Sequence, residues 1–158
     1  MLDALDRKVL TILADEGRIS WKELAHRINL SETPTIRRVR ALEAAGYIQG
    51  YSASISEAAL GRPISVFVSI TLERQNQEEL AVFEPSIASV PQIISCFMLT
   101  GDVDYLLRVV VADMEEFQNL LGKVLRPIPG MKRISSSVAL KSVIQRRTPP
   151  LHAERDFG

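Results

Sequence analysis

Cysteine is almost absent from this sequence of 158 residues, which contains only Cys96. A single cysteine cannot form a disulfide within the chain, and this suits a reducing compartment. Long apolar runs are also missing, since no stretch approaches the ~20 residues that a membrane-spanning helix needs. The first residues carry acids where a signal peptide carries bases, and no apolar run follows them. We therefore expect a cytoplasmic protein without a membrane segment.

Residue types that bind metals or perform catalysis are scarce as well. Of the two histidines, neither His26 nor His152 has a second His or Cys at ligand spacing. Asp102 and Asp104 lack the further oxygen ligands and the closing Glu of an EF-hand. The sequence has no Gly-rich phosphate loop and no nucleophile elbow. These absences predict no metal, no cofactor and no enzymatic activity. An enzyme would need a nucleophile, a base or an anion clamp that converges within residues 64–144.

Net charge is zero, but the charges are unevenly distributed. Residues 1–50 carry 8 basic and 7 acidic side chains, residues 51–130 carry 5 and 10, and residues 131–158 carry 6 and 2. An acidic middle would repel DNA, so any DNA contact is expected at one end of the chain. The content of 46% hydrophobic and 24% charged residues is typical of a globular protein.

Helical patterns fill the first part of the chain. Four apolar residues lie on one face of a first helix: Leu5, Val9, Ile12 and Leu13. Asp3 is a plausible N-cap for this helix and Gly17 a plausible end. Ser20 and Glu23 form a capping-box pattern before a second, short helix. The apolar stripe of that helix consists of Leu24, Ala25 and Ile28.

A third helix is expected from Ser31 or Thr33 to Gly46, with Pro34 in its first turn. Asn29 precedes it at a tight turn, where asparagine tolerates the left-handed conformation. The face toward the core is expected to hold Ile36, Val39 and Leu42. Two short helices, a tight turn and a further helix are the layout of a helix-turn-helix domain.

Strand and helix patterns alternate after this domain. Strands are predicted at 47–53, 64–72, 93–99, 105–111 and 133–144, and helices at 78–89 and 113–125. From residue 64 the order is βαββαβ, a ferredoxin-like arrangement with the helices on one face of the sheet. The fold class is therefore α+β. The predicted divisions are a helix-turn-helix domain at 1–50, a strand and linker at 51–63, a ferredoxin-like domain at 64–145 and a C-terminal arm or tail at 146–158.

The third helix carries the candidate DNA contacts. With the apolar face inward, Thr33, Arg37, Arg40 and Ala44 project outward, and Arg38 lies at the edge of that face. Arginine can pair with guanine in the major groove or bind a phosphate. Hydroxyls of Ser31 and Thr35 at the helix start suit phosphate contacts. The alternative is that the arginines form an ordinary solvated surface, but the preceding helix and turn favour binding to double-stranded DNA.

Several segments, in order and spacing, resemble the Lrp/AsnC family of bacterial and archaeal regulators. They are LDRKVL at 5–10, GRIS at 17–20, SETPTIRRVRALEAAGYIQGY at 31–51, LGRP at 60–63, TGDVDYLL at 100–107 and VADM at 111–114. The resemblance implies a winged-type helix-turn-helix, a βαββαβ regulatory domain, and dimers that associate into octamers or similar discs. It also implies small effectors, usually amino acids, bound in the regulatory domain at the interface between dimers.

The family's effector region matches one loop, part of the last strand and one helix start: Met98, Thr100, Gly101, Asp102, Asp104, Met114, Ser136, Ser137 and Val138. An amino acid needs an acceptor for its ammonium group and donors for its carboxylate. Asp102 or Asp104 is the candidate acceptor, and the donors are the amide of Gly101 with nearby serine and threonine hydroxyls. The alternative is that residues 101–104 are only a hairpin turn. The consecutive serines predict a roomier or more polar pocket, so leucine is not carried over as the effector.

The sequence is compatible with an effector-dependent regulator and with an architectural protein. A regulator of this kind would bind an inverted-repeat site, with half-sites about one helical turn apart or a multiple of it. The other reading is an architectural protein whose discs wrap DNA without an effector. Cys96 is expected to be a small buried hydrophobe within a strand, and Trp21 a core or cap residue.

Overall fold

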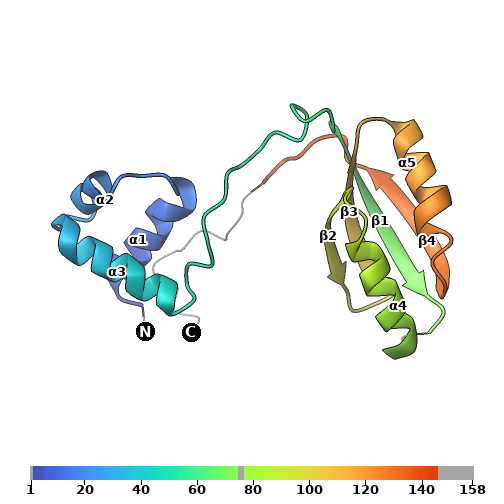
Figure 1. Ribbon diagram of the computed structural model, residues 1–158, viewed down its shortest axis with the longest axis horizontal. Helices are drawn as coiled ribbons and strands as arrows, with labels where there is room; N and C mark the ends of the chain where they lie inside the picture. The colour runs from blue at the N-terminus through green and yellow to red at the C-terminus, as the bar shows by residue number, and fades with distance from the viewer. Residues whose placement is uncertain (1, 75–76, 146–158) are drawn as a thin grey trace. The chain divides into compact units, whose positions relative to one another are not determined.

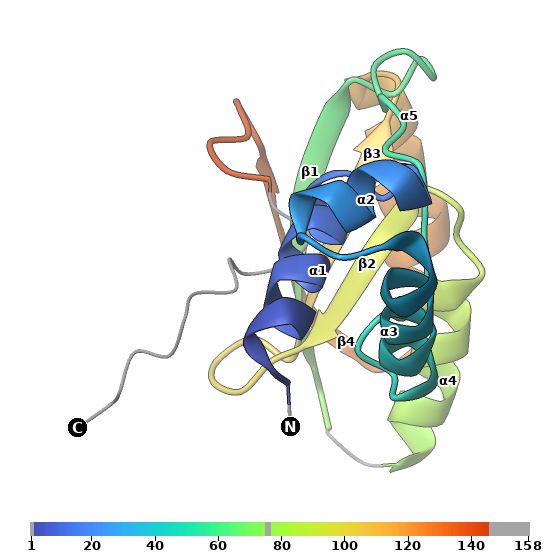
Figure 2. The same cartoon turned by 90° about the vertical axis from the view of Figure 1, so that its left-hand side faces the viewer.

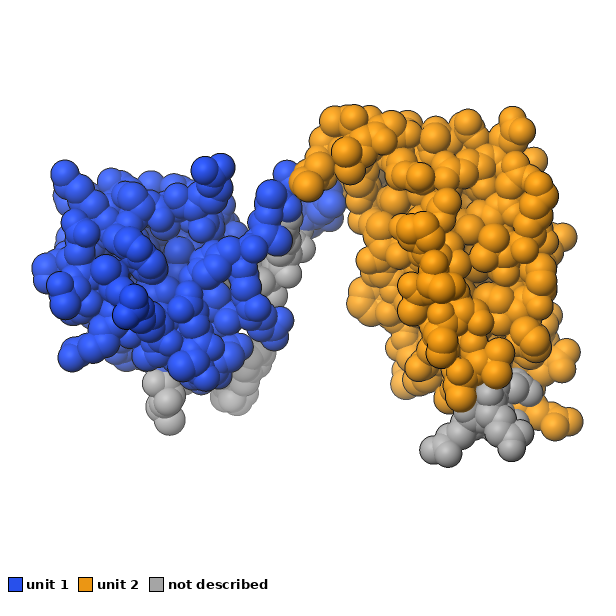
Figure 3. All heavy atoms as spheres, in the orientation of Figure 1, with its two compact units in different colours: residues 1–54, 144–158 blue, residues 55–143 orange. Residues whose placement is uncertain are grey.

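The described chain consists of two compact units, one of residues 2–54 with 144–145 and the other of residues 55–143 (Figure 3). The structure is a computed structural model that describes residues 2–74 and 77–145, without the side chains of 77–79. The predicted arm or tail at 146–158 lies outside the described residues.

The first unit contains three helices: α1 (Ala4–Asp15), α2 (Trp21–Arg27) and α3 (Glu32–Ala44) (Figure 1). Apolar residues from all three bury a small core made of Val9, Leu24, Ile28, Val39 and Leu42. Each helix begins and ends within a residue or two of the position predicted from capping signals. The three-helix arrangement predicted from the sequence is therefore confirmed.

Caps and turns fix the helix ends of this unit. The Asp3 carboxylate accepts from the Asp6 amide at 2.7 Å, and Asp6 accepts in return from the Asp3 amide at 3.0 Å. The Ser20 hydroxyl accepts from the Glu23 amide at 3.1 Å. The Glu23 carboxylate binds Arg27 at 2.9 Å, so the structure records one half of the predicted capping box. Asn29 has φ 57°, the left-handed conformation expected at the turn before α3.

The second unit is a four-stranded antiparallel sheet covered by helices on one face (Figures 1 and 2). The elements are β1 (Ile64–Leu72), α4 (Gln77–Ala88), β2 (Ile93–Met98), β3 (Tyr105–Val111), α5 (Met114–Leu120) and β4 (Met131–Val138). The strand order is β2-β3-β1-β4, as the predicted βαββαβ topology requires. The core lies between the sheet and the helices and includes Val68, Leu107, Phe83, Phe117 and Leu120.

Two predicted strands differ from the structure. No strand forms at 47–53, because the amides of Tyr47 and Ile48 both donate to the Leu42 carbonyl and so belong to the turn that ends α3. The last strand ends at Val138 rather than at residue 144. Its neighbour β1 begins at Ile64, directly after a proline that has no amide to donate, and the Ala139 amide makes the last bond to this strand.

Three further expectations need correction. The helix predicted to residue 125 ends at Leu120 and continues as one π-helical turn to Leu125. Cys96 is exposed rather than buried, because β2 is an outer strand of the sheet. Trp21 is 43% exposed at the first position of α2, so it belongs neither to the core nor to the cap, which Ser20 provides.

Candidate functional site

Helix α3 presents a row of exposed residues opposite its buried face. Thr33, Arg37, Arg40 and Ala44 are all exposed, as the predicted helix phase requires. Within the described part of the chain, neither Arg37 nor Arg40 forms an ion pair. Ser31 is exposed as the N-cap, but its hydroxyl makes no capping bond. Two guanidinium groups and a small residue at each end are thus open to a polyanion.

Two other predicted DNA contacts have partners inside the protein. Thr35 is fully buried, and its hydroxyl donates to the Ser31 carbonyl at 2.9 Å. Arg38 Nη1 lies 2.6 Å from Asp3 and 2.5 Å from Asp6. Val39 and Leu42 are buried as predicted, and Thr35 shares their face because it precedes Val39 by four positions, whereas Ile36 is only partly buried. We therefore correct both assignments: Thr35 packs inside the domain, and Arg38 joins α3 to the start of α1.

Polar contacts join the helices of the first unit to one another and to the segment after α3. The Asp6 amide and, next, the Arg38 guanidinium hold the pKa of Asp3 below its ordinary value. Arg27 binds Glu16 at 2.6 Å and so links the end of α1 to α2, which lowers the pKa of Glu16. The Tyr51 hydroxyl donates to Glu43 at 2.9 Å, and burial together with this bond raises the pKa of Tyr51 to about 12.

The first group of predicted effector residues surrounds the β2–β3 hairpin. Met98 is 58% exposed, and Thr100, Gly101 and Asp102 are exposed in the turn. Gly101 has φ 115°, a conformation that few other residues adopt. Asp104 differs from the others because it is 6% exposed and one carboxylate oxygen accepts from the Leu72 amide at 2.6 Å. Asp104 therefore fixes the hairpin to β1, which leaves Asp102 as the accessible carboxylate.

The remaining predicted effector residues lie away from the hairpin, three on β4 and one on α5. Ser136, Ser137 and Val138 are exposed on β4, and Met114 is 40% exposed at the start of α5. Strands β2 and β4 are the two outer strands, with two strands between them, so they are about 14 Å apart. Tyr105 at the hairpin pairs with Ile70, whereas Val138 pairs with Val66 toward the other end of β1. One copy of the chain therefore does not bring the two groups together.

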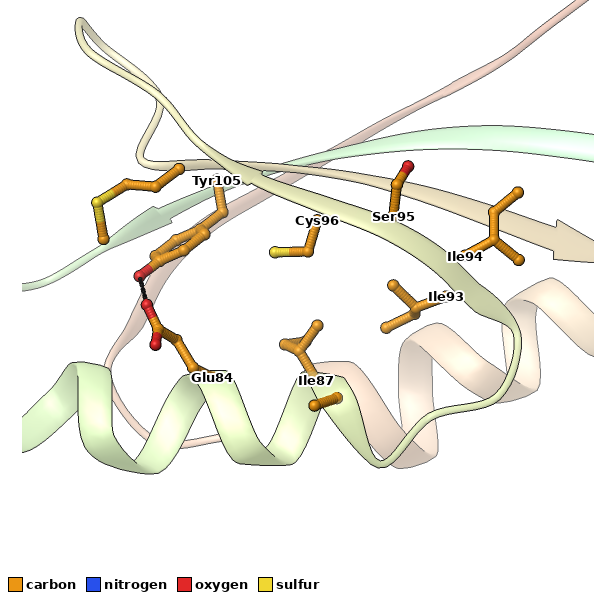
Figure 4. Close-up of a pocket in the computed structure, with 9 residues that line it drawn as sticks. Glu84, Ile87, Ile93, Ile94, Ser95, Cys96 and Tyr105 are labelled. Atoms are coloured by element: carbon orange, nitrogen blue, oxygen red, sulfur yellow. Dashed lines mark hydrogen bonds between the residues drawn. The ribbon is translucent and has the colours of Figure 1, made fainter. Parts of the chain in front are cut away.

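A cavity of about 390 Å³ lies between α4 and the outer strand β2 (Figure 4). Its walls are formed by Ile87, Ile93, Ile94, Met98 and other residues of these elements. The Tyr105 hydroxyl donates to Glu84 at 2.8 Å along one side. No sequence pattern predicts this pair, since 21 positions separate the residues. A smaller cavity of about 110 Å³ beside it is lined by Met98, Leu99, Asp104 and Tyr105 among others.

Residues 2–74 and 77–145 contain no group of three or more His, Cys, Asp or Glu placed to hold a metal ion. In the same residues, no helix has both the length and the apolar character needed to span a membrane.

Comparisons with known proteins agree with this arrangement. Residues 65–149 match the Lrp/AsnC ligand binding domain, and residues 2–49 match a winged helix-turn-helix DNA-binding domain. The chain is 53% identical over 150 residues to the Bkd operon transcriptional regulator of Pseudomonas aeruginosa, covering 95% of this chain and 98% of that protein. It is 40% identical over 144 residues to the leucine-responsive regulatory protein of Escherichia coli K12, covering 91% and 88%.

A solved structure is similar over nearly the whole chain. It is a transcriptional regulator of Neisseria meningitidis in complex with L-methionine, with a TM-score of 0.91 and 32% identity over 96% of this chain and 97% of that one. The family resemblance found in the sequence is confirmed by both domain matches and by these relatives. The chain belongs to the Lrp/AsnC family of DNA-binding transcriptional regulators.

Proposed function

We propose that this regulator binds DNA through the exposed face of α3 and that an amino acid modulates this binding. The observation that carries the DNA contact is the row of exposed residues on α3 in which Arg37 and Arg40 form no ion pair within the described chain. Guanidinium groups on a helix of this kind bind guanine edges and phosphates. Ser31 and Thr33 at the helix start add polar groups for the DNA backbone. Residues 1–50 are thus assigned to DNA and residues 64–145 to the effector and to self-association.

The open face of the sheet supports a dimer. Phe97 on β2, Leu106 on β3 and Phe67 on β1 lie on the face that no helix covers, and the two phenylalanines are 58% and 38% exposed. Contiguous apolar side chains of this kind mark protein interfaces. A second copy of the chain, packed by the same face, would bury them and bring two α3 helices to one DNA duplex. Dimers would then associate into a larger, even-numbered assembly.

An amino-acid effector fits the residues on the sheet. Asp102 would accept from the ammonium group, and Gly101, Thr100 and the β4 serines would donate to the carboxylate. Because the hairpin and β4 lie on opposite edges of the sheet, a site that uses both requires two copies of the chain. The relatives named for leucine response and solved with L-methionine support this chemical class. A single, exposed and unpaired Cys96 fits a protein that works in the cytoplasm.

A DNA titration at fixed salt, repeated with each of the twenty amino acids, tests the whole proposal. The duplex would be an operator fragment that the wild-type protein selects from random sequences. We expect one or more amino acids to change the affinity, since linked binding sites must influence each other reciprocally. Tight DNA binding that no amino acid alters would instead support the architectural reading. Absence of DNA binding would contradict the assignment of α3.

A further inference from the structure

The linker before β1 is fixed to the second unit by its own turn and by two ion pairs. Three backbone bonds close the turn, including the Arg62 amide to the Glu57 carbonyl at 2.9 Å. Glu57 binds Arg108 of β3 at 2.7 Å, and Arg62 binds Glu116 of α5 at 2.8 Å. The chain that leads to the DNA-binding unit is thus tied both to the sheet and to a helix.

The Glu116 side chain connects several segments of the second unit. One carboxylate oxygen accepts from the Ala112 amide at 2.8 Å, just before α5 begins. The other oxygen accepts from Arg62 at 2.8 Å and from the Gln92 side chain at 3.1 Å. Arg62 also donates to the Val110 carbonyl at 3.4 Å. One side chain therefore connects the linker, the segment before β2, the end of β3 and helix α5.

The position of Glu116 relates this cluster to the effector region. Met114, which the family resemblance ties to effector response, lies in the same first turn of α5 and is 40% exposed. A shift of this turn carries Glu116 with it, because both residues are on one short helix. The charged bond then carries the shift to Arg62 and the linker. The Glu57–Arg108 pair does not connect the linker to α5, since Arg108 belongs to β3.

We propose that Glu116 is a positioning residue that transmits a change at the start of α5 to the linker through Arg62. The proposal rests on the proposed amino-acid response, and it adds the path by which that response reaches the DNA-binding unit. A coupling of this kind requires an element that both sites bias. Here that element is the first turn of α5 together with the linker turn.

Hydrogen exchange of the full chain tests the tether without any effector. Glu116→Gln keeps the side-chain size and removes the charge that holds Arg62. We expect the amides of residues 60–62 to exchange about two- to fivefold faster, the range expected for the loss of a partly exposed ion pair. Glu115→Gln is the matched control, because it removes the same charge from the neighbouring, exposed position. Arg62→Gln should give the same increase while α5 keeps its cap.

DNA titrations with and without L-leucine or L-methionine test the transmission. Under the proposed function, we expect one of these amino acids to change the DNA affinity of the wild type by a measurable factor. This factor should fall toward one in Glu116→Gln and Arg62→Gln, while calorimetry shows amino-acid affinity within about threefold of the wild type. The double variant should be no worse than either single one, since both act through the same bond.

The two possible failures are distinct. If the linker exchanges at the wild-type rate in both variants, or if the factor is undiminished in them, Glu116 does not transmit the change and the proposal is overturned. A wild-type protein whose DNA affinity ignores all twenty amino acids contradicts the proposed effector class instead. The exchange data still decide in that case whether Glu116 holds the linker.

Discussion

At the scale of single residues, the arginines of α3 show that residues alike in sequence can have different roles in the structure. Arg37, Arg38 and Arg40 look alike in the sequence, yet only Arg38 is engaged by two carboxylates. Its partners Asp3 and Asp6 lie more than thirty positions away, so local spacing cannot reveal them. Thr33 and Thr35 also look alike, but two positions separate them by about 200° around the helix, so Thr33 is exposed and Thr35 is buried.

Arg37→Ala should weaken DNA binding by roughly 1–3 kcal/mol, because it removes a contact to a base edge or a phosphate. The measurement is a titration of operator DNA at several salt concentrations. Arg126→Ala, which removes the same charge from an exposed position in the second unit, is the control and should change affinity little. Equal affinities for the two variants would contradict the role of Arg37.

Arg38→Ala should act on stability rather than on DNA contacts. Loss of the guanidinium leaves Asp3 and Asp6 facing each other, so the first unit should unfold at a lower temperature. The pKa of Asp3 is lowered in the folded state, and its stabilising contribution is therefore present above the ordinary pKa of 3.8 and lost as pH falls below it. Thermal unfolding should show a difference between wild type and variant at pH 7 that shrinks in acid. A constant difference would mean that the carboxylates are not involved.

At the scale of elements, the sequence defines strands best where both sides are buried or alternate clearly. Strands β1 and β3 were predicted with their observed bounds, because runs of β-branched residues strongly favour strands. The segment 47–53 holds Tyr47, Ile48 and Tyr51, which favour strands, but the turn after α3 uses its first amides. Pairing partners distant in sequence, not local propensity, decide whether such a segment becomes a strand.

Gly46 marks the end of α3, and its replacement should be costly. It has φ 76°, and its amide donates to Glu43 while the next amide donates to Leu42, the pattern of a Schellman cap. Gly46→Ala should lower the free energy of unfolding of the first unit by about 1 kcal/mol, although a methyl group there meets no neighbour. Gly122→Ala also meets no neighbour but needs no positive φ, so it should be neutral or stabilising. Denaturant titrations of both variants check the difference.

At the scale of the whole molecule, topology limits what one copy can do. The sequence predicted the effector residues as one set, because the family resemblance identifies residues but does not give the distances between them in the fold. The fold separates them into a hairpin group and a β4 group on opposite edges of the sheet, with Met114 on helix α5. Of the nine residues, Asp104 is the one whose side chain is buried, and its carboxylate accepts from the Leu72 amide.

Self-association should therefore be a condition for effector binding. Phe97→Asp places a charge on the open sheet face and should give a smaller particle by light scattering. The same variant should lose the rise in unfolding temperature that an effector gives the wild type, since binding to the folded state alone is stabilising. Val82→Asp is the control, because Val82 is 49% exposed on α4 instead. An unchanged thermal response in a monomeric Phe97 variant would contradict the need for two copies.

The attachment of residues 55–63 has a practical consequence for protein engineering. These residues connect two domains in sequence, but their turn and both ion pairs place them in the second unit. In a chimera that fuses the DNA-binding domain of another protein to the second unit, the junction should therefore lie before Ile55. A junction at the conspicuous Gly61-Arg62-Pro63 motif would discard Glu57 and leave Arg108 without its carboxylate. The transplantable regulatory module thus begins about nine residues before its first strand.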